Sequence, residues 1–146
     1  MTRISLLKET QDEEANKILN EINAQFGMIP KLWSAYANYP ALLKANWHKQ
    51  SAVMHEGKLS EVLKQSVALI VSIQNSCAYC VDAHTMMLNS MGIDSNNIKN
   101  NLDMMKLNEK EKLLFNLAKQ INKNATKIED ELFQTLKLND VSRDCK

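Results

Sequence analysis

Glycine and proline are scarce in this chain, with only 3 and 2 residues among 146. An all-β fold needs many tight turns, and these two residues build most of them, so the shortage argues against a β protein. Leucine, alanine, lysine, glutamate and methionine are abundant instead, and all of them form helices readily. We therefore expect an all-α bundle of about seven helices, folded as a single domain over residues 1–146.

The chain also lacks a long apolar run and a dominant sign of charge. No stretch approaches the roughly 20 apolar residues that a membrane-spanning helix requires. The first residues contain too short an apolar stretch for a secretory signal. The net charge of +1 provides no electrostatic attraction to nucleic acid or to an anionic membrane. We therefore expect no nucleic-acid or membrane partner and a cytoplasmic location, where thiols are normally reduced.

Capping residues and apolar spacing divide the first half of the chain into helices. Thr10 and Glu13 have the spacing of a capping box for a first helix. Pro30 can open a short second helix, and Pro40 suits the first turn of a longer third one. Ser60 can cap a fourth helix, which is apolar around much of its circumference. This fourth helix is therefore expected to be the most buried element.

The second half of the chain has a similar pattern. Asn75 and Ser76 interrupt the apolar run and can cap the next helix. A short helix is expected over residues 94–102, and Asn108 with Glu111 marks the start of a longer one. The last helix is expected over residues 128–138. The side chains expected to face inward on the final two helices are Leu113, Leu114, Leu117, Ala118, Ile121, Leu132, Phe133 and Leu136.

The most informative feature is a pair of cysteines, Cys77 and Cys80, followed by His84 at the expected start of a helix. Two thiols separated by two residues can close a disulfide with little backbone movement. The free N–H groups and the macrodipole of a helix N-terminus stabilise a thiolate. At about 100° per residue, the three side chains fall within an arc of roughly 60°. A nucleophile therefore lies on the same face as a possible base.

Two other interpretations of the cysteine pair remain open. A structural zinc site normally needs four ligands in two separated pairs. The other candidates, Cys145, His48 and His55, form no second pair, so we expect no metal. Buried cysteines that act as small hydrophobic residues are the second alternative. That interpretation leaves His84, on the same face, without an explanation.

Residues 59–92, LSEVLKQSVALIVSIQNSCAYCVDAHTMMLNSMG, resemble the alkylhydroperoxidase D-like branch of the carboxymuconolactone decarboxylase family. Residues 26–47 resemble the helices that precede this segment in the peroxidase-related members of the family. Together these segments cover about half of the chain. The diagnostic pattern is C-x-x-C-x-x-x-H on a helix that follows a long apolar one.

The resemblance implies an all-helical homo-oligomer, since dimers, trimers and hexamers all occur in this branch. It also implies thiol-dependent reduction of a small hydroperoxide without a cofactor, with the disulfide then reduced by a thiol or disulfide-reductase donor. In such proteins the second cysteine attacks the peroxide and the first closes the disulfide. The resemblance therefore implies that Cys80 attacks the peroxide, Cys77 closes the disulfide and His84 relays the proton. A sulfenate on Cys80 would be captured by Cys77 before further oxidation.

The chain departs from the family pattern twelve residues before the first cysteine. The redox-active members have a glutamate there that orients and charges the histidine, whereas this chain has Gln65. A glutamine can hold a ring N–H, but it is neutral and cannot stabilise an imidazolium. Glu61 and Asp82 are nearby carboxylates that could compensate. We therefore expect weak peroxidase turnover with dithiol–disulfide chemistry retained.

A second departure lies at the C-terminus. Related chains usually continue through a further helix after a segment like Leu136–Val141, whereas this sequence stops at Lys146. One layer of the bundle is therefore expected to be missing or supplied by a neighbouring subunit. Cys145 stands apart from the other two cysteines in a polar tail.

Two further functions compete with peroxide reduction. The first is a non-catalytic, oligomeric helical protein that keeps the fold as a binding or scaffold module, with the thiols as packing residues. The second is lactone decarboxylation, which is disfavoured because the cysteine pair belongs to the redox branch. A thiol that alkylates rapidly near pH 6 would exclude the scaffold, because an unperturbed cysteine has a pKa near 8.5.

Overall fold

The structure is a computed structural model that describes residues 3–96 and 107–138. These residues form seven helices and no strand, so the expected all-α fold is confirmed. The chain divides into two compact units, Met1–Glu56 and Gly57–Lys146, each with its own core. The expectation of a single domain stays a prediction. None of the helices in the described ranges is long and apolar enough to cross a membrane.

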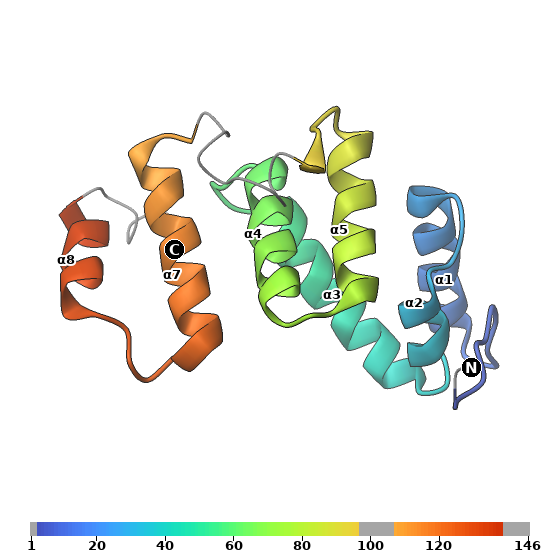
Figure 1. The fold of residues 1–146 in the computed structure, drawn as a ribbon. Helices are drawn as coiled ribbons and strands as arrows, with labels where there is room; N and C mark the ends of the chain where they lie inside the picture. Colours follow the sequence, from blue (N-terminus) through green and yellow to red (C-terminus); the bar gives the residue numbers. More distant parts are fainter. Residues whose placement is uncertain (1–2, 97–106, 139–146) are drawn as a thin grey trace. The chain divides into compact units, whose positions relative to one another are not determined.

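The first unit contains α1 (Glu13–Phe26), α2 (Lys31–Tyr36) and α3 (Pro40–His55). Helix α3 packs against both α1 and α2 (Figure 1). The apolar stripe of α1 faces this core, as its helical spacing predicts. The buried residues of the cluster are Ala15, Ile18, Leu19, Ile22, Trp33, Ala37, Leu43 and Trp47.

The start of α1 differs from the expectation. Asp12 is the N-cap, and its Oδ1 accepts a hydrogen bond from the N–H of Ala15 at 2.9 Å. The capping box expected from Thr10 and Glu13 is therefore wrong. A carboxylate is a stronger acceptor than a hydroxyl at a helix N-terminus, and the Thr10 hydroxyl instead accepts from the N–H of Asp12 at 3.0 Å. The Ala15 hydrogen bond, followed by the one from Lys44, holds the pKa of Asp12 below its usual value.

The second unit contains α4 (Glu61–Gln74), α5 (Ala78–Ser90), α7 (Glu109–Asn124) and α8 (Asp130–Leu138). Helix α4 packs against both α5 and α7, and α8 packs against α7. Figure 1 shows α4 between its two neighbours. This central position agrees with the broad apolar surface of α4, which has a partner on two sides.

Two of the expected caps in this unit are confirmed. Ser60 caps α4, and its Oγ accepts from the N–H of Leu63 at 3.2 Å. Asn108 and Glu111 form a reciprocal capping box at the start of α7, with both hydrogen bonds 2.9 Å long. The short helix expected over residues 94–102 lies mostly among residues 97–106, outside the described part of the chain.

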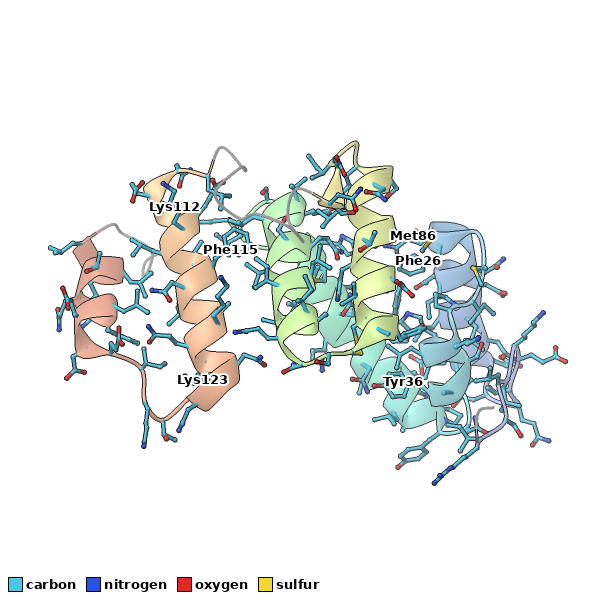
Figure 2. All side chains as sticks on the ribbon, in the orientation of Figure 1. Phe26, Tyr36, Met86, Lys112, Phe115 and Lys123 are labelled. Carbon is cyan, nitrogen blue, oxygen red and sulfur yellow. A yellow bond between two sulfur atoms is a disulfide. The ribbon has the colours of Figure 1, made fainter. Side chains whose placement is uncertain are left out.

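The core of the second unit lies between α4, α5 and α7. It contains Leu63, Leu69, Ile70, Leu88 and Phe115. Figure 2 shows Phe115 on the side of α7 that faces α4. A smaller cluster between α7 and α8 is built on Leu132 and Leu136, with Leu113, Leu114, Leu117 and Ile128 packed against it.

The inward-facing side chains were only partly predicted. Phe115, which the apolar pattern did not single out, is 3% exposed, whereas Ile121 and Phe133 are 45% and 48% exposed. Helix α7 packs against both α4 and α8, so its buried residues lie on two faces. Ile121 belongs to neither of the two clusters on those faces. On α8, the ammonium group of Lys137 lies 5.7 Å from the ring centroid of the exposed Phe133.

Candidate functional site

Cys77 and Cys80 lie at the N-terminus of α5 and are joined by a disulfide. Their Cα atoms are 5.3 Å apart, within the range that disulfides usually span. Cys77 is itself the N-cap, and its Sγ accepts from the N–H of Cys80 at 3.4 Å. The expected cap from Asn75 or Ser76 is therefore wrong. Both cysteines are half-buried.

The turn between α4 and α5 explains why Cys77 occupies the cap. Helix α4 ends in a Schellman motif, in which Ser76 has the left-handed conformation with a φ of 53°. The N–H of Ser76 donates to the carbonyl of Ile73, and the N–H of Cys77 donates to that of Ser72, both at 3.0 Å. The same residue, Cys77, therefore completes the end of α4 and begins α5. A residue with a Cβ in this conformation costs about 1–2 kcal/mol.

Asn122 of α7 reaches this turn, and the sequence contained no signal for it. The side-chain amides of Asn75 and Asn122 exchange two hydrogen bonds, of 3.1 and 2.9 Å. Asn122 Nδ2 also donates to Gln74 Oε1 at 3.3 Å. The turn that carries Cys77 is therefore tied to a third helix of the same unit.

His84 lies one turn beyond Cys80 on α5 and is half-buried. Its Nδ1 is 2.7 Å from Oε1 of Gln65, which projects from α4 and is 4% exposed. Because an amide oxygen can only accept, Nδ1 carries the hydrogen in this contact. Nε2 then keeps its lone pair and can act as a base. The structure thus brings together Gln65 and His84, as their assignment to one site required.

The electrostatics of this pair differ from those of a carboxylate–histidine pair. Burial lowers the pKa of His84 below its ordinary value of 6.5. Gln65 supplies an acceptor without a negative charge, so it does not offset this loss of hydration. Glu61 and Asp82, the carboxylates considered as replacements, are both exposed, and the ring nitrogen Nδ1 faces Gln65 instead. The imidazole is therefore held neutral at pH 7.

The remaining candidate residues lie outside this group. His48 and His55 are exposed on α3 of the first unit, in agreement with a surface position. Cys145 lies outside the described residues. Within the described ranges, no three histidine, cysteine, aspartate or glutamate side chains gather where they could hold a metal ion.

Comparison with known proteins identifies the family of the chain. The model of the carboxymuconolactone decarboxylase family matches residues 40–120, which is more than half of the sequence. Over 76 residues the chain is 30% identical to an alkyl hydroperoxide reductase of Mycobacterium tuberculosis. This match covers 52% of the chain but only 22% of that relative's length.

Two solved structures share the fold of this chain. A peroxidase-related protein from Silicibacter sp. TM1040 aligns with a TM-score of 0.80 and 23% identity, over 93% of this chain and 74% of that one. An alkylhydroperoxidase AhpD core protein from Ralstonia eutropha JMP134 aligns with a TM-score of 0.77 and 18% identity, over 95% and 77% of the two chains. These two matches show the fold alone.

A third solved structure lies closer in sequence. The alkylhydroperoxidase AhpD core of Rhodospirillum rubrum aligns with a TM-score of 0.60 and 26% identity, over 91% of this chain and 98% of that one. The resemblance drawn from residues 59–92 is confirmed, because the family match includes that whole segment. This chain belongs to the carboxymuconolactone decarboxylase family.

Proposed function

We propose that this protein reduces small hydroperoxides with the Cys77 and Cys80 thiols, which an external thiol or disulfide reductase then regenerates. The observation that carries the proposal is the disulfide at the N-terminus of α5, one turn before a histidine whose Nε2 keeps its lone pair. The names of the relatives, an alkyl hydroperoxide reductase and peroxidase-related proteins, support the same reaction class.

In the proposed reaction, His84 takes the proton of the Cys80 thiol and later returns it to the leaving group. The Cys80 thiolate attacks the terminal oxygen of the hydroperoxide, so an S–O bond forms and the O–O bond breaks. The alkoxide that leaves takes the proton and becomes an alcohol, while Cys80 is oxidised to a sulfenic acid. The Cys77 thiol then loses its proton and attacks this sulfur, so the S–S bond forms and the S–O bond breaks, and the departing hydroxide takes up a proton to leave as water. Two electrons from the external donor reduce the disulfide again.

The position of Cys77 suits the resolving step. Its sulfur faces the first N–H groups of α5 and already accepts from the N–H of Cys80. Unpaired N–H groups at a helix N-terminus favour negative charge, so a Cys77 thiolate is stabilised there. The two thiols thus have different means of activation: the helix end for Cys77 and the imidazole for Cys80.

The neutral contact between Gln65 and His84 makes the proposed turnover slow. An imidazolium forms during proton transfer, and in the described part of the chain Nδ1 faces the neutral amide of Gln65 rather than a carboxylate. Loss of the carboxylate behind a catalytic histidine lowers the rate by orders of magnitude in enzymes that depend on it. We therefore expect that the cysteine pair still cycles between dithiol and disulfide but reacts slowly with peroxide.

The proposal is tested by oxidation of the reduced protein in a Cys145→Ser background, which leaves a single cysteine pair. Treatment with hydrogen peroxide or cumene hydroperoxide at pH 7 should remove two thiols per chain and yield the Cys77–Cys80 disulfide by mass spectrometry. Cys80→Ser should abolish this reaction. Cys77→Ser should stop at a sulfenic acid that dimedone traps.

The opposite result favours the competing function. If peroxide leaves both thiols intact and Cys80 alkylates at pH 6 no faster than free cysteine, the peroxidase proposal is wrong. The chain would then be a helical binding or scaffold protein with the cysteines as packing residues.

A further inference from the structure

The turn before Cys77 adopts a conformation that serine does not favour. Helix α5 ends in the same Schellman motif as α4, and there the left-handed position belongs to Gly92, with a φ of 77°. At the end of α4 the equivalent residue is Ser76, with a φ of 53°. A residue in a sparsely populated backbone region persists where surrounding contacts hold it, and such residues gather at functional sites.

Side-chain contacts from α7 add to the backbone hydrogen bonds that hold this turn. Helices α4 and α7 pack against each other, and Figure 1 shows their C-terminal ends pointing to the same side. Lys123, the neighbour of Asn122, is labelled at that end of α7 in Figure 2. Asn122 both donates to and accepts from the amide of Asn75, at 2.9 and 3.1 Å. A reciprocal amide pair fixes orientation as well as distance, because both groups of each amide are engaged.

We propose that Asn122 is a positioning residue for the Cys77–Cys80 couple. Its amide pair with Asn75 holds the Asn75–Ser76–Cys77 turn, so that Cys77 stays at the N-cap of α5 with its sulfur toward Cys80. This inference rests on the proposed redox function and adds a residue from another helix to the same site.

The amide pair should favour the disulfide over the dithiol. In the oxidised protein the disulfide itself restrains the turn, so the amide pair is fully formed. In the reduced protein the turn can leave this conformation, and the amide pair biases it back toward the geometry that closes the disulfide. The amide pair and the disulfide thus stabilise each other, and such coupling is reciprocal. The factor by which the disulfide favours the amide pair equals the factor by which loss of the amide pair lowers the equilibrium constant for disulfide formation.

The test is the equilibrium constant for disulfide formation in glutathione buffers, measured by mass spectrometry in the Cys145→Ser background. Asn122→Ala removes hydrogen bonds between solvent-exposed amides, which lie at the lower end of the usual range, and should lower this constant about two- to threefold, a change of about 10–15 mV in the two-electron potential. Asn116→Ala, which removes an exposed asparagine from the same helix, should leave the constant unchanged. The double variant Asn75→Ala/Asn122→Ala should resemble the single variant, because both substitutions break one interaction.

A merely structural role for Asn122 gives a different result. The free energy of unfolding would then fall equally in the oxidised and reduced proteins, and the disulfide constant would stay at the wild-type value, which overturns the proposal. An equal effect of Asn116→Ala overturns it as well. If Asn122→Ala does not fold, Asn122→Asp keeps an acceptor for Asn75 and should lower the constant by a smaller factor; an unchanged constant in that variant also overturns the proposal.

The outcome is separate from that of the peroxidase test. Glutathione exchange measures the equilibrium between the Cys77–Cys80 dithiol and disulfide in the absence of peroxide. If peroxide does not oxidise the thiols, the proposed function is refuted, and the disulfide equilibrium constant alone then decides whether Asn122 positions the turn.

Discussion

Replacement of Gln65 by glutamate should strengthen the proton relay at His84. Gln65 Oε1 lies 2.7 Å from Nδ1, and glutamate has nearly the same shape, so the substitution changes charge with little change in packing. Gln65→Glu should therefore raise the pKa of His84, because a carboxylate stabilises the imidazolium that burial disfavours.

The size of the effect follows from the distance. Two unit charges about 4 Å apart attract by about 4 kcal/mol at the effective dielectric constant of protein sites. Burial of the new carboxylate in a position that is 4% exposed offsets part of this attraction. A hydrogen bond to a charged group contributes a net stabilisation of about 1.5–3 kcal/mol. This corresponds to about a tenfold to hundredfold larger population of the imidazolium–thiolate pair.

The assay is the rate of Cys80 alkylation by iodoacetamide between pH 5 and 9, in a Cys77→Ser/Cys145→Ser background. Gln65→Glu should shift the rise in rate to lower pH and increase oxidation by peroxide. Gln134→Glu adds the same charge at an exposed position of α8 and should change neither. An alkylation profile that is identical in the Gln65→Glu and wild-type backgrounds would refute the argument, because the imidazole would then have no influence on the thiol.

Two further predictions concern stability. The pKa of His84 is lower in the folded protein than in the unfolded chain, so below about pH 6.5 the unfolded chain binds more protons. The contribution of His84 to the free energy of unfolding should therefore be complete above that pH and should fall as the pH drops below it. Urea unfolding at pH 7.5 and 5.5 should show this loss of stability in the wild type and a smaller loss in His84→Asn. His48 is exposed, so the control variant His48→Asn should lose as much stability as the wild type. Equal losses in all three proteins would contradict the assignment. Thr85 Oγ1 is buried with no hydrogen-bond partner among the described residues, so Thr85→Val should raise the free energy of unfolding by about 1 kcal/mol. The control variant Ser66→Ala should not be more stable than the wild type, because the buried Ser66 hydroxyl donates to the carbonyl of Val62 at 2.7 Å. A lower free energy of unfolding in Thr85→Val would show that the Thr85 hydroxyl does not destabilise the fold.

Most of the helices, and the candidate residues on α5, could be predicted from the sequence alone. Helix periodicity and caps such as Asn108 with Glu111 depend on residues a few positions apart, so they can be predicted locally. The spacing of Cys77, Cys80 and His84 also brings them to one face at the start of a helix. Together with the long apolar helix before it, this motif indicated the family.

The contacts between helices became known only from the folded chain. Which ring nitrogen of His84 carries the hydrogen depends on how α4 packs against α5 and brings Gln65 to Nδ1. The amide pair of Asn75 and Asn122 joins residues 47 positions apart, and the exposure of Ile121 depends on the faces of α7 that its neighbours cover. These features depend on packing between distant segments, which no local pattern of residues contains.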